Sequence, residues 1–125
     1  MIPWWKTSFD SNEIELVSES IRNGNISQGP QVGRFEAALS QYLDVKNVVA
    51  VSNGSAALLL ALIACDVKPG DEVIMPDRAW IASAHAVQLL GAKVRLVDVE
   101  SDRPIMDTKK IEAEITSKTK VIMPV

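Results

Sequence analysis

The stretch that decides the fold is Val48-Val-Ala-Val-Ser-Asn-Gly-Ser-Ala-Ala-Leu-Leu-Leu-Ala-Leu-Ile-Ala-Cys65. Its first part, residues 48–51, is a short β-branched run that ends at a turn, which is the pattern of a fully buried strand. Within the turn, Asn53 and Gly54 tolerate a left-handed backbone, and Ser55 is a suitable cap for the helix that follows. Residues 56–64 are apolar with high helix propensity, which predicts a helix buried on most of its circumference.

This order of strand, glycine turn and helix predicts an anion site at the start of the helix. The first N–H groups of a helix have no partner within it, the macrodipole adds partial positive charge, and Ser55 offers a hydroxyl. A phosphate group fits such a site. The same junction also occurs where an α/β chain only changes direction, so a plain turn is the competing interpretation.

The bulk composition is that of one globular domain. The chain has 125 residues, of which 47% are hydrophobic and 23% charged, with a formal net charge of −3. This mildly acidic balance, without a basic run, argues against nucleic-acid binding. The longest apolar run, residues 56–65, is too short to cross a membrane. We expect Cys65, the one cysteine, to be a buried reduced thiol in a cytoplasmic protein, and we predict no metal site.

The N-terminal region predicts an arm followed by two helices. Trp4 and Trp5 are costly to expose, so we expect them to pack on the protein's own core, on a partner subunit or on a flat ligand. A first helix begins at the capping pair Asp10 and Glu13 and ends at residues 23–24. After a polar loop at residues 25–30, a second amphipathic helix presents an inner face that contains Val32, Phe35, Leu39 and either Tyr42 or Leu43.

Strands and helices alternate through the remainder of the chain. Further strands are predicted at residues 72–75, 93–99 and 120–125, and helices at 81–90 and after a cap at Asp107 or Thr108. Residues 67–71 contain proline and glycine in the positions of a type II turn. The alternation predicts an α/β fold with a mostly parallel sheet flanked by helices. Because no helix follows the last apolar strand, we expect the 125 residues to be a truncated part of a domain.

Several groups of residues, in this order along the chain, resemble the N-terminal part of the DegT/StrS sugar-nucleotide aminotransferases. That family consists of pyridoxal-phosphate enzymes of the aspartate-aminotransferase fold type (fold type I). The resemblance implies an N-terminal arm and helix at residues 1–23 and an incomplete cofactor-binding large domain at 24–125. It rests on Ser27-Gln-Gly-Pro30 with Phe35-Glu36, Val51-Ser-Asn-Gly-Ser-Ala-Ala-Leu58, Pro69-Gly-Asp-Glu-Val-Ile-Met-Pro76, Trp80-Ile-Ala-Ser-Ala84, Gly91-Ala92 with Val97-Asp-Val99, and Ile115-Thr-Ser-Lys-Thr-Lys120.

The resemblance also implies roles for five residues. Gly54 and Ser55 match the pair that binds the phosphate of pyridoxal 5'-phosphate, in agreement with the helix argument. Trp80 matches the aromatic residue that stacks on the pyridine ring, and a cationic heterocycle on an indole face is physically favourable. Without the family, a core tryptophan is the simpler interpretation of Trp80. Ser27 and Gln28 match a loop near the sugar-nucleotide site.

Other positions depart from the family pattern or are absent. Ala79 replaces a common threonine, and His85 replaces a common asparagine and is interpreted as a packing residue. Asp98 is interpreted as structural. In the family, the aspartate at the pyridine nitrogen and the lysine that forms the Schiff base both lie downstream of residue 125. We therefore predict no catalytic residue in this chain.

The leading hypothesis is an N-terminal fragment of an aminotransferase that acts on a nucleotide-linked keto-sugar with an amino-acid donor, as in polysaccharide biosynthesis. The whole protein is expected to be a homodimer, and the 125 residues alone to be inactive and prone to associate. Two alternatives remain, namely another enzyme of this fold, such as a desulfurase or aldolase, and a non-catalytic binding or regulatory module. A dinucleotide-binding domain is disfavoured because no Gly-x-Gly-x-x-Gly follows a predicted strand.

Overall fold

The computed structural model describes residues 2–3 and 5–124, and it consists of two compact units, Met1–Ala50 and Val51–Val125. The expected packing of Trp4 and the end of the predicted last strand at Val125 lie outside the described residues. Trp5 is 73% exposed, so within the described chain it does not pack on a core. The predicted boundary between an N-terminal arm and helix (residues 1–23) and the large domain (residues 24–125) remains a prediction about the whole protein.

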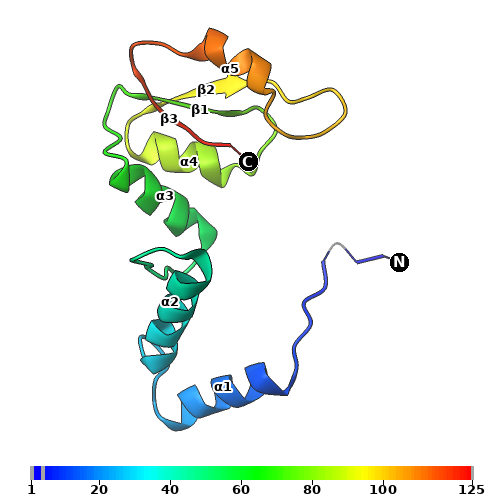
Figure 1. Ribbon diagram of the computed structural model, residues 1–125, viewed down its shortest axis with the longest axis vertical. Helices are drawn as coiled ribbons and strands as arrows, with labels where there is room; N and C mark the ends of the chain where they lie inside the picture. Colours follow the sequence, from blue (N-terminus) through cyan, green and yellow to red (C-terminus); the bar gives the residue numbers. More distant parts are fainter. Residues whose placement is uncertain (1, 4, 125) are drawn as a thin grey trace. The chain divides into compact units, whose positions relative to one another are not determined.

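The first unit contains two helices, α1 (Ser11–Arg22) and α2 (Pro30–Leu43), which follow an extended arm (Figure 1). The backbone N–H of Asp10 donates to Glu13 Oε2 at 2.7 Å, and the N–H of Asn12 donates to Asp10 Oδ1 at 2.8 Å. This reciprocal capping confirms the predicted start of α1. Pro30 occupies the first turn of α2, where its missing N–H removes no helical bond.

The predicted buried strand at residues 48–51 is not formed, so the structure corrects this expectation. The segment has no regular secondary structure, and Val49 is 68% exposed. The backbone N–H of Ala50 donates to Glu36 Oε1 at 2.8 Å, so a side-chain carboxylate accepts the hydrogen bond that a neighbouring strand would accept in a sheet. A β-branched run indicates a preference for extended backbone, but a strand also requires a partner strand to bond.

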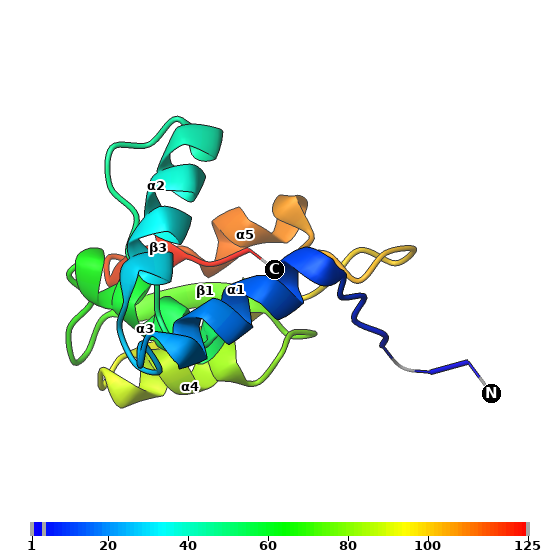
Figure 2. The same cartoon turned by 90° about the horizontal axis from the view of Figure 1, so that it is seen from below.

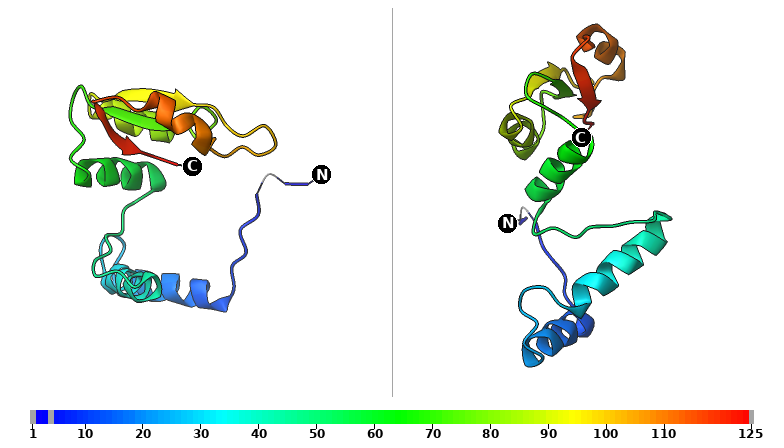
Figure 3. Two further views of the ribbon diagram at one scale, coloured as in Figure 1. Left: turned by 45° about the horizontal axis from the view of Figure 1, so that its top comes forward. Right: turned by 90° about the vertical axis from the view of Figure 1, so that its left-hand side faces the viewer.

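The second unit is an α/β layer structure with a parallel sheet, as predicted. The sheet has the order β2-β1-β3, and both pairings are parallel. Helix α4 lies on one face of the sheet and α5 on the other (Figures 1 and 2), and β3 runs beside β1 on the side away from β2 (Figure 3). The elements are α3 (Gly54–Ala64), β1 (Glu72–Pro76), α4 (Ala82–Leu89), β2 (Lys93–Val97), α5 (Thr108–Glu114) and β3 (Thr119–Ile122).

Strand β1 is the centre of the core because it is buried on both faces. On the α4 face, Val73 packs in a cluster with Leu62 of α3, with Ala86 and Val87 of α4, and with Val67 and Ala92 from the segments that follow these helices. On the α5 face, Ile74 packs with Val97 and Met106. Adjacent residues of β1 serve different clusters because successive side chains of a strand point to opposite faces.

Within the described residues, the deciding stretch is less buried than its composition predicts for the whole protein. Leu62 is the one buried residue of α3, whereas Leu60 and Ile63 are 42% and 51% exposed. Within the described residues this apolar helix packs along α4, and Leu62 also contacts the cluster that contains Val73 of β1, so only one side of the helix is covered. Cys65 was expected to be buried but is exposed, because it is the residue at which α3 ends.

The turn before β1 confirms the predicted type II turn at residues 67–71. Gly70 has φ +92°, and the N–H of Asp71 donates to the carbonyl of Lys68 at 3.1 Å, as in a type II turn. Gly91 ends the α4 segment with φ +71°. Helix and strand boundaries otherwise differ from the predicted ones by a few residues. No helix in the described part of the chain has the length and apolar character needed to cross a membrane.

Candidate functional site

The start of α3 is capped by Asn53, not by Ser55 as predicted. Asn53 has an extended backbone, with φ −167°, and its Oδ1 accepts the N–H of Ala56 at 2.9 Å. Gly54 is the first helical residue, and its φ is not positive, so neither residue uses the left-handed conformation expected from the sequence. Asparagine is among the best capping residues, and it stands one position before the helix begins.

This capping leaves two backbone donors unpaired at the helix terminus. The N–H of Ala57 donates to the carbonyl of Asn53 at 3.1 Å, and the N–H of Ala56 is taken by the cap. The N–H groups of Gly54 and Ser55 have no acceptor within the described residues. Both donors and the Ser55 hydroxyl therefore stand at the positive end of the helix dipole.

A cavity of about 580 Å³ adjoins this terminus, and Trp80 lines the same cavity. Trp80 follows β1 in the loop that leads to α4, and it is 76% exposed. The structure thus brings together three of the predicted site residues, of which Trp80 lies 25 positions after Ser55 in the sequence. The full lining is Gly54, Ser55, Ala57, Leu58, Ala61, Trp80 and Ala82.

The donor set of this cavity fits a ligand with an anionic group and a flat ring. No charged side chain of the described residues lines it, so an anion there would be held by the helix N-terminus and a hydroxyl. The indole and the apolar side chains of α3 suit a heterocycle. The volume lies within the usual range for small-molecule sites, about 300–1,000 Å³. Pyridoxal phosphate has both of these chemical features.

Ser27 and Gln28 belong to the first unit, where both are exposed in the loop between α1 and α2. A cavity of about 690 Å³ in that unit lies between α1 and α2 and is lined mainly by apolar residues such as Leu16, Ile21 and Phe35. Neither Ser27 nor Gln28 lines it. Their role near a sugar nucleotide therefore remains a prediction from the resemblance.

The positions that depart from the family pattern lie beside the cavity or away from it. Ala79 lines a neighbouring cavity of about 300 Å³ together with Trp80, while His85 is exposed on α4. The Asp98 carboxylate accepts a hydrogen bond from Lys110 Nζ at 2.6 Å, and this contact lowers the pKa of Asp98. Asp98 therefore forms a surface ion pair, in keeping with a structural role.

Sequence reasoning missed the part that Asn53 plays in this site. Its capping bond consumes the Ala56 N–H and so determines which donors remain for a ligand. The signal was present, because Asn53 stands three residues before Ala56, the spacing of a cap and the N–H it accepts. The capping role was instead given to Ser55, since serine is equally favourable as a cap.

The chain is similar to sugar aminotransferases in sequence and in structure. Residues 7–125 match the model of the DegT/DnrJ/EryC1/StrS aminotransferase family. A UDP-4-amino-4-deoxy-L-arabinose–oxoglutarate aminotransferase from Shewanella sediminis is 34% identical over 99% of this chain and 32% of its own length.

Solved structures show the same fold. The pyridoxamine-phosphate (PMP) form of Spr1654 from Streptococcus pneumoniae, described as a sugar aminotransferase, superposes with a TM-score of 0.91 at 37% identity, over 98% of this chain and 31% of that one. The Escherichia coli GDP-4-keto-6-deoxy-D-mannose-3-dehydratase with bound hydrated PLP superposes with a TM-score of 0.89 at 26% identity, over 98% and 33% of the two chains. The chain thus spans about a third of the length of these relatives, and it belongs to the DegT/DnrJ/EryC1/StrS aminotransferase family.

Proposed function

We propose that this chain holds the cofactor-phosphate part of a pyridoxal-phosphate aminotransferase that acts on a nucleotide-linked keto-sugar. The observation that carries the proposal is the shared cavity of Gly54, Ser55 and Trp80 in a chain of this family. The N–H groups of Gly54 and Ser55 and the Ser55 hydroxyl would bind the phosphate, and the Trp80 indole would cover the ring. When bound, the cofactor supplies a carbonyl group that takes up an amino group from a donor and passes it to an acceptor.

In this proposal the residues of this chain bind and orient the cofactor, and we assign none of them to proton transfer. In the whole protein, an amino acid such as glutamate would be the donor, and Ser27 and Gln28 would lie near the sugar nucleotide. We place the protein in the cytoplasm, as a homodimer, in the biosynthesis of a polysaccharide. The named substrate of the Shewanella relative, a UDP-linked amino sugar, supports this substrate class.

The activity is tested by incubating the whole protein with pyridoxal phosphate, glutamate and a panel of UDP-, GDP- and dTDP-linked keto-sugars. We expect 2-oxoglutarate to form only when both glutamate and one of the keto-sugars are present. Alanine released from cysteine, or cleavage of a β-hydroxy amino acid, would instead favour a desulfurase or an aldolase. Cofactor binding without turnover of any substrate would favour a non-catalytic module.

A second candidate reaction is dehydration of the sugar, because the similar Escherichia coli protein is a 3-dehydratase of a GDP-linked keto-sugar. The same incubation separates the two reactions. Amino transfer yields an amino sugar in a one-to-one ratio with 2-oxoglutarate. A dehydratase instead yields a deoxy-sugar that carries no nitrogen, which mass spectrometry of the nucleotide sugar distinguishes.

Substitution of Trp80 tests the ring-binding part of the site. Trp80→Ala is expected to weaken cofactor binding by about 3- to 30-fold, because it removes an aromatic and cation–π contact. Trp80→Phe should retain most of the affinity. Titration with pyridoxal phosphate and with pyridoxal, which has no phosphate, should show the same loss for Trp80→Ala. Ile81→Ala is the control, since Ile81 is exposed next to Trp80 but does not line the cavity; equal losses in both variants would contradict the assignment.

A further inference from the structure

Strand β3 begins beside β1 with an irregular register, and this irregularity has an identifiable cause. Val73 pairs with Val121 and Ile74 with Ile122, but Glu72 pairs with Thr119. Lys120 is therefore an extra residue, as in a β-bulge. The bulge lies at the amino end of the sheet, at the end opposite to the loop that carries Trp80.

Hydrophobic patterning does not explain the bulge. Val121 and Met123 pack against the core cluster on the α4 face, and straight pairing that continued from Val73 and Val121 would leave both in place. Straight pairing would also set Glu72 directly opposite Lys120, which is a favourable cross-strand pair of opposite charges. On residue types alone, the straight register is the better one.

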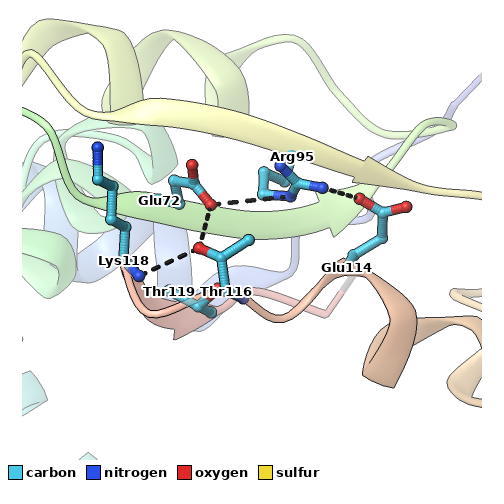
Figure 4. Close-up of polar contacts among 6 residues, drawn as sticks. All are labelled: Glu72, Arg95, Glu114, Thr116, Lys118 and Thr119. Atoms are coloured by element: carbon cyan, nitrogen blue, oxygen red, sulfur yellow. Dashed lines mark hydrogen bonds and ion pairs between the residues drawn. The ribbon is translucent and has the colours of Figure 1, made fainter.

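The contacts of Glu72 favour the bulge instead. Thr116 Oγ1 donates to Glu72 Oε2 at 2.7 Å (Figure 4). The backbone N–H of Glu72 donates to the carbonyl of Lys118 at 2.9 Å. The Glu72 side chain is only 11% exposed. A buried carboxylate that loses such a donor leaves an unsatisfied charge, which costs more than a surface ion pair returns.

The turn before β3 is held in the shape that presents this hydroxyl. The N–H of Thr116 donates to Thr119 Oγ1 at 2.9 Å, and the N–H of Thr119 donates to the Thr116 carbonyl at 3.1 Å. The N–H of Lys118 donates to Thr116 Oγ1 at 3.1 Å. Thr116 thus joins the turn to Glu72, and Thr119 is kept in the position opposite Glu72.

Arg95 of β2, the strand on the opposite side of β1 from β3, also favours the bulged register. Its Nε lies 3.8 Å from Glu72 Oε2, and its Nη2 donates to Glu114 Oε2 at 2.5 Å (Figure 4). The Nε atom is buried and has no hydrogen-bond partner among the described residues. If Glu72 turned toward Lys120, this buried guanidinium nitrogen would lose its nearby opposite charge.

We propose that the Glu72 carboxylate, by accepting the Thr116 hydroxyl, selects the bulged start of β3 over straight pairing with Lys120. Glu72, Arg95, Glu114 and Thr116 together form a clasp that joins β1, β2, α5 and the turn before β3. Its role is to specify conformation, because the core residues of β3 are satisfied by either register. Removal of the clasp should therefore change the register locally and leave the rest of the domain folded.

The test is the crystal structure of the whole protein carrying Thr116→Val, which keeps the shape of the side chain and removes the hydroxyl. We expect Glu72 to lie opposite Lys120 in this variant, with a melting temperature lower by about 2–4 °C. If Thr116→Val does not fold, Thr116→Ala is the second variant. It removes the hydroxyl without adding a methyl group, and we again expect Glu72 to lie opposite Lys120. A variant without the hydroxyl that keeps Glu72 opposite Thr119 overturns the proposal, even if its melting temperature falls.

Two matched variants complete the experiment. Thr116→Ser restores a hydroxyl at the same position, and we expect it to keep the bulge and the melting temperature. Ser117→Ala removes a hydroxyl from the neighbouring exposed residue, which makes no hydrogen bond within the described chain, and it should change neither. Loss of the bulge in Thr116→Ser or in Ser117→Ala would show that the register depends on something other than the contact with Glu72.

Discussion

Replacing Ser55 with aspartate is expected to lower the affinity of the whole protein for pyridoxal phosphate by at least about 100-fold, because a carboxylate would stand beside the phosphate in a cavity that no cationic side chain of the described residues lines. Ser55→Ala should lower it by about 10- to 100-fold, since one hydrogen bond to a charged group is lost and the backbone donors remain. Both affinities are measured by titration with pyridoxal phosphate followed by absorbance.

The same titration with pyridoxal separates loss of the phosphate site from misfolding. Pyridoxal has no phosphate, so its affinity should hardly change in Ser55→Ala or Ser55→Asp. Ser101→Asp, which adds the same charge in an exposed loop after β2, is the control for net charge. If Ser55→Asp weakens the binding of pyridoxal as much as that of pyridoxal phosphate, Ser55 does not bind the phosphate group.

Replacing Leu62 with alanine should lower the free energy of unfolding by about 2–5 kcal/mol. Leu62 is 2% exposed and packs with Val67, Val73 and Val87, so its truncation leaves a cavity in the cluster that joins α3 to the sheet. Urea unfolding followed by circular dichroism gives the free energy. A loss of this size is a large fraction of the stability of an ordinary domain.

Leu89→Ala is the matched control, because Leu89 is the last residue of α4 and is 73% exposed. Its truncation should change the free energy of unfolding by no more than about 0.5 kcal/mol. An equal loss in Leu62→Ala and Leu89→Ala would mean that Leu89 is covered in the whole protein, or that Leu62 does not anchor α3 as the structure shows.

Local signals in the sequence predicted the elements whose stability is local. The capping pair Asp10 and Glu13 predicted the start of α1, because both hydrogen bonds lie within one turn of the chain. The proline and glycine of residues 67–71 predicted the type II turn before β1, in which Gly70 adopts a positive φ without steric cost. The alternation of strands and helices predicted the parallel sheet, since parallel neighbours require a crossover connection.

Burial and pairing were predicted less well because they depend on residues far away in the chain. The composition of α3 shows that it is apolar, but not that its neighbours among the described residues cover only one side of it. Residues 48–51 have the composition of a strand, but no strand among the described residues pairs with them, so they form none there. The hydroxyl that we propose selects the bulge belongs to Thr116, 44 positions from Glu72, and no local sequence pattern indicates this contact.

The sequence by itself determined the family, the α/β class and the identity of the candidate site residues Gly54, Ser55 and Trp80, because each depends on residue types at short spacing. Only the tertiary structure decided that these three residues line one cavity and that Asn53, not Ser55, caps α3. The physical reason is that the cavity forms where α3 packs along α4, and the cap depends on which side chain reaches a backbone N–H. Residue types alone leave Asn53 and Ser55 equally favourable as caps, and they do not show which helices pack together. Both outcomes therefore depend on the three-dimensional packing.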